Sequence, residues 1–449
     1  MRVARMARRR LGSRRPRPHL PPRWGAGRWP RPLPGPRSAE RRKIGDGRMT
    51  RAWRGVLAGM ALCAGMWAGV AGAVDLTIGF IGDLSGPGAN VAQDQLDGFR
   101  LAIKHLGGRI GGNEFGLIVA DGRHDAKLTR QALDRMQQND RLEFLLVSLS
   151  PSHIAQLLAP AVAGKTLVIS LNSPPASMAG RDCSPSFFSL AGLTETMNDL
   201  SGQYLQQRGI KTLVVAGPDT PASRAALQAL RRGFKGDITE MTSRRGEMDF
   251  SSNLRTIRSA APDAVYLLHT GGMAVNFIRQ SAEMFGKDRF PLFGPPSLID
   301  QTLLAASGPA ALGIGSIGFW SEDMDSPVNR RMQIDFESDY GRMASAYAAI
   351  GYDAAMLLDS ALRAADKKNI GEDVLRTALR RVEIPSTHGA AHFDSNHFAI
   401  QTYVARQVVQ DARDRMVDEQ RGVFAKDVRD GHAGECPMRW TIEPPPKGP

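Results

Sequence analysis

The sequence predicts an α/β protein made of two doubly wound parallel-sheet lobes. Short apolar runs alternate with amphipathic helical stretches along most of the chain, a pattern typical of parallel sheets covered by helices on both faces. The alternation occurs in both halves, and no repeat of 20 to 50 residues accompanies it. Residues 74–449, which we expect to be the working protein, are also too many for one ordinary core.

In the first half, the apolar run at 76–81 predicts a strand because it is short and bounded by a turn rich in Gly and Pro. A helix is expected to follow at 91–106. Three more short apolar runs predict strands at 117–120, 144–147 and 167–170. The amphipathic stretches between them predict helices at 127–138 and 153–163.

The second half repeats this order. Strands are expected at 213–216, 264–268 and 291–293, with helices at 223–232, 250–260 and 273–285. Residues 326–365 form a final helical region, because apolar side chains recur there at helical spacing and are expected to be core: Phe336, Tyr340, Met343, Tyr347, Ile350 and Met356. After Pro385 the chain returns to strand character at 401–404.

The N-terminal part contains a secretory signal in an unusual position. Residues 49–73 have a basic start, an uncharged run from Val56 to Val70 and the small residues Ala71 to Ala73 at the end. The run is too short for a typical membrane anchor, and Leu62 before Cys63 disfavours a lipoprotein. We expect residues 1–48 to be a disordered Arg/Pro arm or a leader included by a misassigned start, with Met49 the initiator.

This leader also accounts for the basic charge of the chain. Residues 1–48 hold 16 Lys and Arg against 2 Asp and Glu, while the whole chain has a net charge of +13. The segment 74–449 holds 40 basic and 43 acidic residues. A nucleic-acid partner, which a strongly basic chain would suggest, is therefore not expected.

Once the signal is removed, only Cys183 and Cys436 remain. Two cysteines in an oxidising compartment commonly pair. We expect a disulfide between them; the alternative is two free thiols.

Several motifs resemble cofactor or metal sites but lack the necessary context. Gly313–Gly318 spells G-x-G-x-x-G, yet the chain continues in extended form through Phe319 to Ser321, where a dinucleotide fold needs a helix. Gly164–Thr166 precedes a strand and is expected to be a surface turn. His388, His392, Asp394 and His397 are the one metal-like cluster, and we interpret them as loop residues. No cofactor, metal or catalytic residue is predicted.

Polar loops follow the predicted strands of the first lobe. In open parallel sheets, ligands bind beyond the carboxyl ends of the strands. Hydroxyls, amides and a helix N-terminus in these loops are suited to an anionic or polar group, although the serines can equally act as helix caps. The candidate ligand-binding residues of this lobe are Ser85, Gly86, Ser150, Ser152, Asn172 and Ser173.

Taken in order, several stretches of residues 76–410 resemble the branched-chain amino-acid-binding group of type I periplasmic binding proteins. The stretches are 78–80 through Gly86–Pro87, 101–103 through 107–112, Asp121, Ser150–Ser152, 262–265 and Gly351–Ala354. The resemblance implies two lobes joined by three crossovers, which we place near 188–194, 318–321 and Pro385. Lobe 1 then comprises 74–190 and 320–384, lobe 2 comprises 191–319 and 385–412, and 413–449 is a C-terminal extension.

The resemblance also implies a function. Such proteins trap a small solute between the lobes and deliver it to an ABC permease in the inner membrane, as periplasmic monomers without catalysis. Thr220, Ala222 and Met273 are expected to line the second lobe. Because Ala222 replaces a usual tyrosine and Met273 a usual acidic partner of the ligand ammonium, we expect a hydrophobic or aromatic acid, or an alcohol-derived metabolite, instead of an ordinary amino acid.

The ending at 436–440 resembles a subgroup linked with PQQ-dependent alcohol dehydrogenase systems. Two other functions stay open at this point. The same fold serves extracytoplasmic sensors that signal to a membrane receptor, and an exported enzyme is a third alternative.

Overall fold

The computed structural model describes residues 76–139, 141–365 and 371–438, all of which belong to one compact unit. The leader at 1–48, the signal at 49–73 and the end of the tail lie outside the described residues. Among those that are described, no helix has the length and apolar character needed to cross a membrane.

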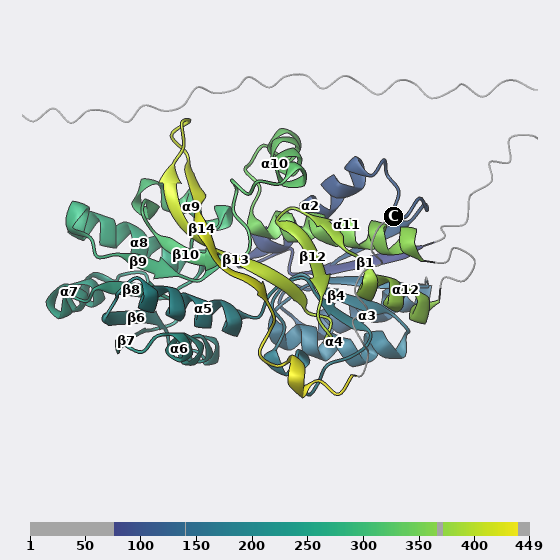
Figure 1. Ribbon diagram of the computed structural model, residues 1–449, viewed down its shortest axis with the longest axis horizontal. Coiled ribbons are helices and arrows are strands. Elements are labelled where there is room, and N and C mark those ends of the chain that lie inside the picture. The colour runs from purple at the N-terminus through teal and green to yellow at the C-terminus, as the bar shows by residue number, and fades with distance from the viewer. Residues whose placement is uncertain (1–75, 140, 366–370, 439–449) are drawn as a thin grey trace, which may run out of the picture. The chain divides into compact units, whose positions relative to one another are not determined.

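The first half of the chain builds a parallel five-stranded sheet in the order β2-β1-β3-β4-β5 (Figure 1). Its strands are apolar because both faces are covered by helices, and β1 and β3 are buried along their whole length. The strands are β1 (Thr77–Gly82), β2 (Gly116–Asp121), β3 (Phe144–Ser148), β4 (Leu167–Ser170) and β5 (Phe187–Ser189), and the helices are α2 (Ala89–His105), α3 (Ala126–Asn139), α4 (Pro151–Ala163) and the 3-10 turn η2 (Ala176–Met178).

The second sheet has the order β11-β12-β13-β10-β9-β8-β6-β7, and β14 pairs with β13. Its parallel part runs from β10 to β7 and comprises β6 (Thr212–Pro218), β7 (Asp237–Ser243), β8 (Ala264–Leu267), β9 (Leu292–Gly294) and β10 (Gly315–Gly318). The intervening helices are α5 (Thr194–Gln207), α6 (Pro221–Gly233), α7 (Ser251–Ala260), α8 (Gly271–Phe285) and α9 (Gln301–Ser307), with 3-10 turns η3 (Gly286–Asp288), η4 (Pro296–Leu298) and η5 (Gly308–Ala311). The α/β class with parallel sheets is thus confirmed.

The expected helical region 326–365 is two helices, α10 (Pro327–Tyr340) and α11 (Ala346–Ala364). Gly341 ends α10 in the left-handed region, with φ 68°. α11 packs closely on α2, because Gly98 and Gly351 let the two backbones approach: a Cβ on Gly351 would lie 1.9 Å from the Gln95 carbonyl oxygen. The Gly351–Ala354 motif is therefore a packing motif.

The last part of the chain connects the two sheets. It comprises α12 (Glu372–Arg381), β11 (Ile384–Ser386), β12 (Gly389–Phe393), β13 (Ala399–Gln410), β14 (Met416–Val428) and η6 (Ala433–Glu435). β11, which contains Pro385, and β12 join the second sheet through β13, while β11 also packs on α11 and β12 on α12. The later residues of β13 pair with β10, so the chain passes from the first sheet's helices to the parallel part of the second sheet along β11–β13.

The segment from 413, expected as a C-terminal extension, begins with a strand that continues the second sheet. β14 pairs antiparallel with β13 from Gln410↔Met416 to Gln401↔Val428, with register shifts that mark bulges. The hairpin is the long yellow ribbon beside β10 in Figure 1. Sequence reasoning missed β14 because its outer half is exposed and polar, so no apolar run marks it. For the same reason it missed β7, a largely exposed edge strand.

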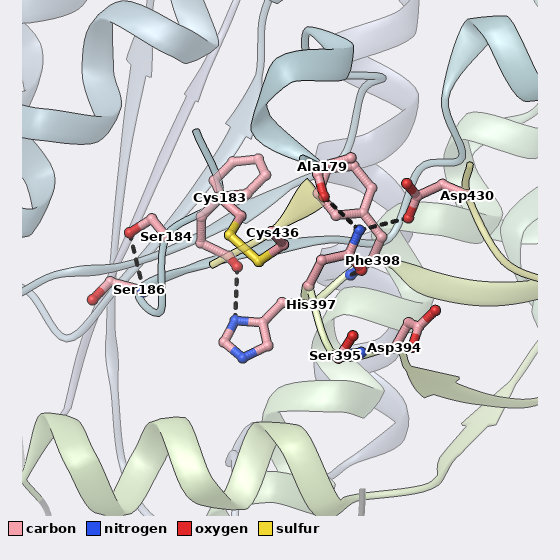
Figure 2. The surroundings of a disulfide bond; sticks show 12 residues. Ala179, Cys183, Ser184, Ser186, Asp394, Ser395, His397, Phe398, Asp430 and Cys436 are labelled. Carbon is pink, nitrogen blue, oxygen red and sulfur yellow. Dashed lines mark hydrogen bonds between the residues drawn. A yellow bond between two sulfur atoms is a disulfide. The ribbon is translucent and has the colours of Figure 1, made fainter. Parts of the chain in front are cut away.

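A disulfide joins Cys183 to Cys436, the pair that the sequence predicts, with an S–S distance of 2.01 Å (Figure 2). It fixes the tail that follows β14 to the loop before β5. Asn396 reinforces the attachment, since its Nδ2 donates to the Ala179 carbonyl and to Asp430 Oδ2. The end of the chain is thereby tied back to the first sheet.

The histidine-rich cluster is spread over separate partners. His388 Nδ1 lies 3.2 Å from Asp353 Oδ2, and Asp394 Oδ1 accepts from Arg429. His397 is buried: its Nδ1 donates to the Phe187 carbonyl, visible in Figure 2, and its ring stacks on Phe188 with centroids 4.2 Å apart. These contacts join β12–β13 to β5.

Candidate functional site

A cavity of about 430 Å³ lies where the carboxyl ends of the first sheet's strands meet the second half of the chain. Parallel sheets place ligand sites at this edge because the loops after neighbouring strands converge there. Lobe 1 contributes the loops after β1, β2, β3, β4 and β5. The rest of the lining consists of residues 295–297, Asp300, Phe319 and the first turns of α11, the helix that packs on α2.

The loop after β3 brings two hydroxyls to the cavity. Ser150 is the N-cap of α4, with extended φ −64° and ψ 154°, but its side chain makes no capping hydrogen bond. Its Oγ lies 3.3 Å from Ser152 Oγ. Pro151 at the first helical position has no N–H, and the His153 and Ile154 amides donate to the Ser150 carbonyl. Among the described residues, the Ser152 amide is therefore the one at the start of α4 that has no hydrogen-bond partner, next to the Ser150 hydroxyl.

Ser148 lies two residues earlier, at the end of β3. Its side chain lines the cavity and is 2% exposed, and its Oγ has no hydrogen-bond partner in the part of the chain that the structure describes. A buried hydroxyl without a partner is unfavourable by about 1 to 3 kcal/mol. A polar ligand atom at this position would satisfy it.

The loop after β4 is held in place by its own polar side chains. Asn172 Nδ2 donates to the Leu149 carbonyl, and Asn172 Oδ1 accepts from Gln95 Nε2 at 2.9 Å. Ser173 Oγ accepts from the Thr194 amide at 2.9 Å. Asn172 and Ser173 therefore join three loops at the cavity rim, and both line the cavity.

Much of the cavity lining is apolar. Pro296, Phe319, Tyr347, Ile350 and Leu149 line the cavity. Burial raises the pKa of the Tyr347 phenol, so this side chain is neutral near neutral pH. The cavity thus combines hydroxyl and amide groups with aromatic and aliphatic side chains.

Two carboxylates line the cavity, and both already have partners. Asp300 caps α9: its Oδ1 accepts from the Thr302 amide and its Oδ2 from the Ala346 amide, both at 2.9 Å. Burial raises the pKa of this carboxyl. Asp83 Oδ2 lies 3.0 Å from His124 Nδ1, and its Oδ1 accepts from the His124 amide at 2.8 Å.

Of the predicted ligand residues, the structure brings Ser150, Asn172 and Ser173 to this cavity and leaves six outside it. In lobe 1, Ser152 is exposed, Ser85 is placed beside Asp121, and Gly86 forms a left-handed turn with φ 81°. Those on the second lobe are also elsewhere: Thr220 Oγ1 caps α6 through the Ser223 amide, Ala222 is exposed, and Met273 Sδ accepts from the Gly246 amide.

Strand order explains the position of the second-lobe residues. Thr220, Ala222 and Met273 follow β6 and β8, which lie toward the far edge of the sheet, whereas the cavity meets the sheet at β9 and β10. Sequence reasoning also missed Asp83 and His124, which directly follow β1 and β2. The rule that ligands lie after parallel strands could have identified both.

The chain belongs to the periplasmic binding protein family, whose profile matches residues 75–413. Solved structures with the same fold include a solute-binding protein of an ABC transporter from R. palustris in complex with benzoate. That protein is 23% identical to this chain, and the alignment covers 81% of this chain and 99% of that protein, with a TM-score of 0.71. A solute-binding protein from Rhodopseudomonas palustris BisB5, in complex with 3,4-dihydroxybenzoic acid, is 21% identical over 79% of this chain and 98% of its own, with a TM-score of 0.72.

The leucine-binding protein LivK of Thermotoga maritima is 18% identical, covers 78% of this chain and 99% of its own, and has a TM-score of 0.67. Among the curated proteins, no match was found. The fold is therefore that of the type I periplasmic binding proteins, as the resemblance implied.

Proposed function

We propose that this protein is a solute-binding protein that captures a small organic carboxylate and delivers it to an ABC importer. One observation carries the proposal: a protein of this family has a cavity of about 430 Å³ at the carboxyl edge of its first parallel sheet, closed on the other side by the second half of the chain. A volume of this order suits a single small ligand. Binding between two halves can also couple capture to closure.

The lining supports a ligand with an apolar body and one anionic end. The Ser148 and Ser150 hydroxyls and the positive N-terminal end of α4 favour an anion, whereas Phe319, Tyr347 and Ile350 favour an apolar or aromatic body. Similar proteins hold benzoate and 3,4-dihydroxybenzoate. Aromatic monocarboxylates are thus our preferred class.

An ordinary amino acid fits this cavity less well. Its ammonium group would need a free carboxylate, because an unpaired buried charge costs several kcal/mol. The carboxylates that line the cavity are already paired, Asp83 with His124 and Asp300 with the amides of Thr302 and Ala346. Met273, where an acidic residue was expected, does not line the cavity.

The cellular context completes the proposal. We infer export through the signal at 49–73, a periplasmic monomer, an ABC permease as partner and no catalytic step. Association with PQQ-dependent alcohol dehydrogenase systems is proposed only from the resemblance of the ending at 436–440.

Isothermal titration calorimetry tests the proposal. We expect benzoate or 4-hydroxybenzoate to bind more tightly than leucine. Ser150→Ala should lower the affinity for the aromatic acids by about 3- to 10-fold, because one hydrogen bond is lost. Ser259→Ala is a matched control, since Ser259 is an exposed helical serine of α7 outside the cavity. Absence of binding by every carboxylate, or tighter binding of leucine, would contradict the proposed ligand class.

A further inference from the structure

His124 has a special place in the charge balance of the cavity. Among the described residues that line it there is no Lys or Arg, and His124 is the one side chain that can become a cation. Asp300 accepts three hydrogen bonds from uncharged donors, two of them from Thr302. Asp83 is thus the cavity carboxylate that is in contact with a side chain able to become a cation.

The backbone around the histidine is held by two carboxylates. Arg123 and His124 have φ 52° and 55°, a positive range that is uncommon for residues other than Gly and in which His, Asn and Asp are over-represented. Asp121 Oδ1 accepts from the Arg123 amide at 3.0 Å and Asp83 Oδ1 from the His124 amide. These bonds fix the position of the His124 ring.

The same contacts orient the imidazole. Because Asp83 Oδ2 lies 3.0 Å from Nδ1, the proton stays on Nδ1 and Nε2 is left without a hydrogen bond within the described part of the chain. The ring is 43% exposed. Gly86 lies beside the ring, since a Cβ there would be 3.6 Å from Nε2, an ordinary van der Waals contact.

Sheet register places this ring near the proposed anion site. Gly82 of β1 is opposite both Asp121 of β2 and Ser148 of β3. The loops carrying His124 and Ser150 therefore lie on either side of Asp83, and both residues line the same cavity.

We propose that His124 is a specificity-determining residue that selects anionic ligands by taking up a proton at Nε2 when they bind. This inference rests on the proposed function. With the ring neutral, Asp83 leaves the cavity negative and repels an anion. With the ring protonated, the Asp83–His124 pair is neutral and Nε2–H donates to the ligand's anionic group, so binding and protonation reinforce each other.

Other charged groups nearby have their own partners. Arg123 pairs with Asp121 at 3.6 Å, and Asp125 accepts from the amides of Lys127 and Leu128. On α4, His153 lies outside this cavity. Asp83 is thus the charged group in direct contact with the imidazole.

The test uses the protein as purified, with benzoate as anionic probe and benzamide as its uncharged counterpart. His124→Asn removes the titratable ring while keeping a residue that tolerates the left-handed region. We expect this substitution to lower the affinity for benzoate by about 10- to 100-fold, the effect of losing one charge-assisted hydrogen bond. The affinity for benzamide should fall by less than about 3-fold. His153→Gln, a histidine on α4, is the matched control and should leave both affinities unchanged.

Calorimetry in two buffers of different ionisation enthalpy gives a second readout. Near pH 8, benzoate binding should take up a proton in the wild type and not in His124→Asn. If benzoate binds the wild type but affinity and proton uptake are unchanged in the variant, the role of His124 is refuted while the proposed function stands. If no carboxylate binds the wild type, both fail. Circular dichroism of each variant verifies its fold, and if His124→Asn does not fold, His124→Gly, which also allows positive φ, replaces it.

Discussion

Removing the Cys183–Cys436 disulfide should strongly destabilise this protein. The bond closes a loop with a sequence separation of 253 residues, which includes both sheets except β1, β2, β3 and β4. The perturbation we choose is the double variant Cys183→Ser, Cys436→Ser. Both substitutions leave a side chain of similar size, so the main change is the loss of the covalent link.

The magnitude follows from the loop length. In the chain-entropy treatment, closing a loop of about 250 residues removes roughly 18 to 19 cal/mol/K from the unfolded chain, which corresponds to about 5.5 kcal/mol at 25 °C. The other tail contacts remain in the variant, including the Asn396–Asp430 hydrogen bond of 2.6 Å and the β13–β14 pairing. We therefore expect a loss of about 3 to 5.5 kcal/mol in the free energy of unfolding.

Urea unfolding followed by far-UV circular dichroism measures this loss. Wild-type protein with dithiothreitol is the internal control: it should unfold at the same urea concentration as the double variant, while dithiothreitol should leave the double variant unchanged. A difference below about 1 kcal/mol between oxidised wild type and double variant would show that loop closure does not stabilise the fold, and would refute the reasoning.

Two further perturbations test the packing and the buried histidine. Gly351→Ala should lower the free energy of unfolding in urea by more than about 3 kcal/mol, since its Cβ would lie 1.9 Å from the Gln95 carbonyl oxygen. The control is Gly272→Ala, a helical glycine with open space, which should lower it by less than about 0.5 kcal/mol. Equal effects of the two substitutions would contradict the close approach of the two backbones. Burial and the Arg380 guanidinium lower the pKa of His397 to about 3, so the unfolded state binds more protons than the folded state below pH 6.5 and stability is lost as pH falls. From pH 7 to pH 5 this group should lower the free energy of unfolding by about 2 kcal/mol, and the loss should be absent in His397→Asn. Parallel pH profiles of unfolding for the wild type and the variant would contradict this expectation.

Local sequence patterns were sufficient to determine the α/β class and the position of most elements. The apolar runs at 144–147 and 167–170 became buried strands, because a strand covered on both faces needs a continuous apolar run. The pairing of Cys183 with Cys436 followed from there being no other cysteine after the signal. These features depend only on neighbouring residues or on counting.

Elements that lack such a pattern were missed or misplaced. β14 is polar along its exposed half, and the crossing of the chain along β13 depends on its pairing with β10, about 90 residues earlier in the sequence.

Gly351 and the neighbouring Asp353 carry a family motif, but only packing showed their roles: Asp353 accepts from the Thr387 amide and the Ser386 hydroxyl.

For the site, sequence alone determined that polar loops follow the strands of the first sheet. Only the tertiary structure decided which of those loops meet. Ser150 and Ser173 reach the cavity because the loops after all five strands of the first sheet converge there, whereas Ala222 and Met273 follow strands of the second sheet remote from it. The reason is physical: strand order arises from pairing between distant segments, and a linear pattern of apolar residues carries no information about which strands become neighbours.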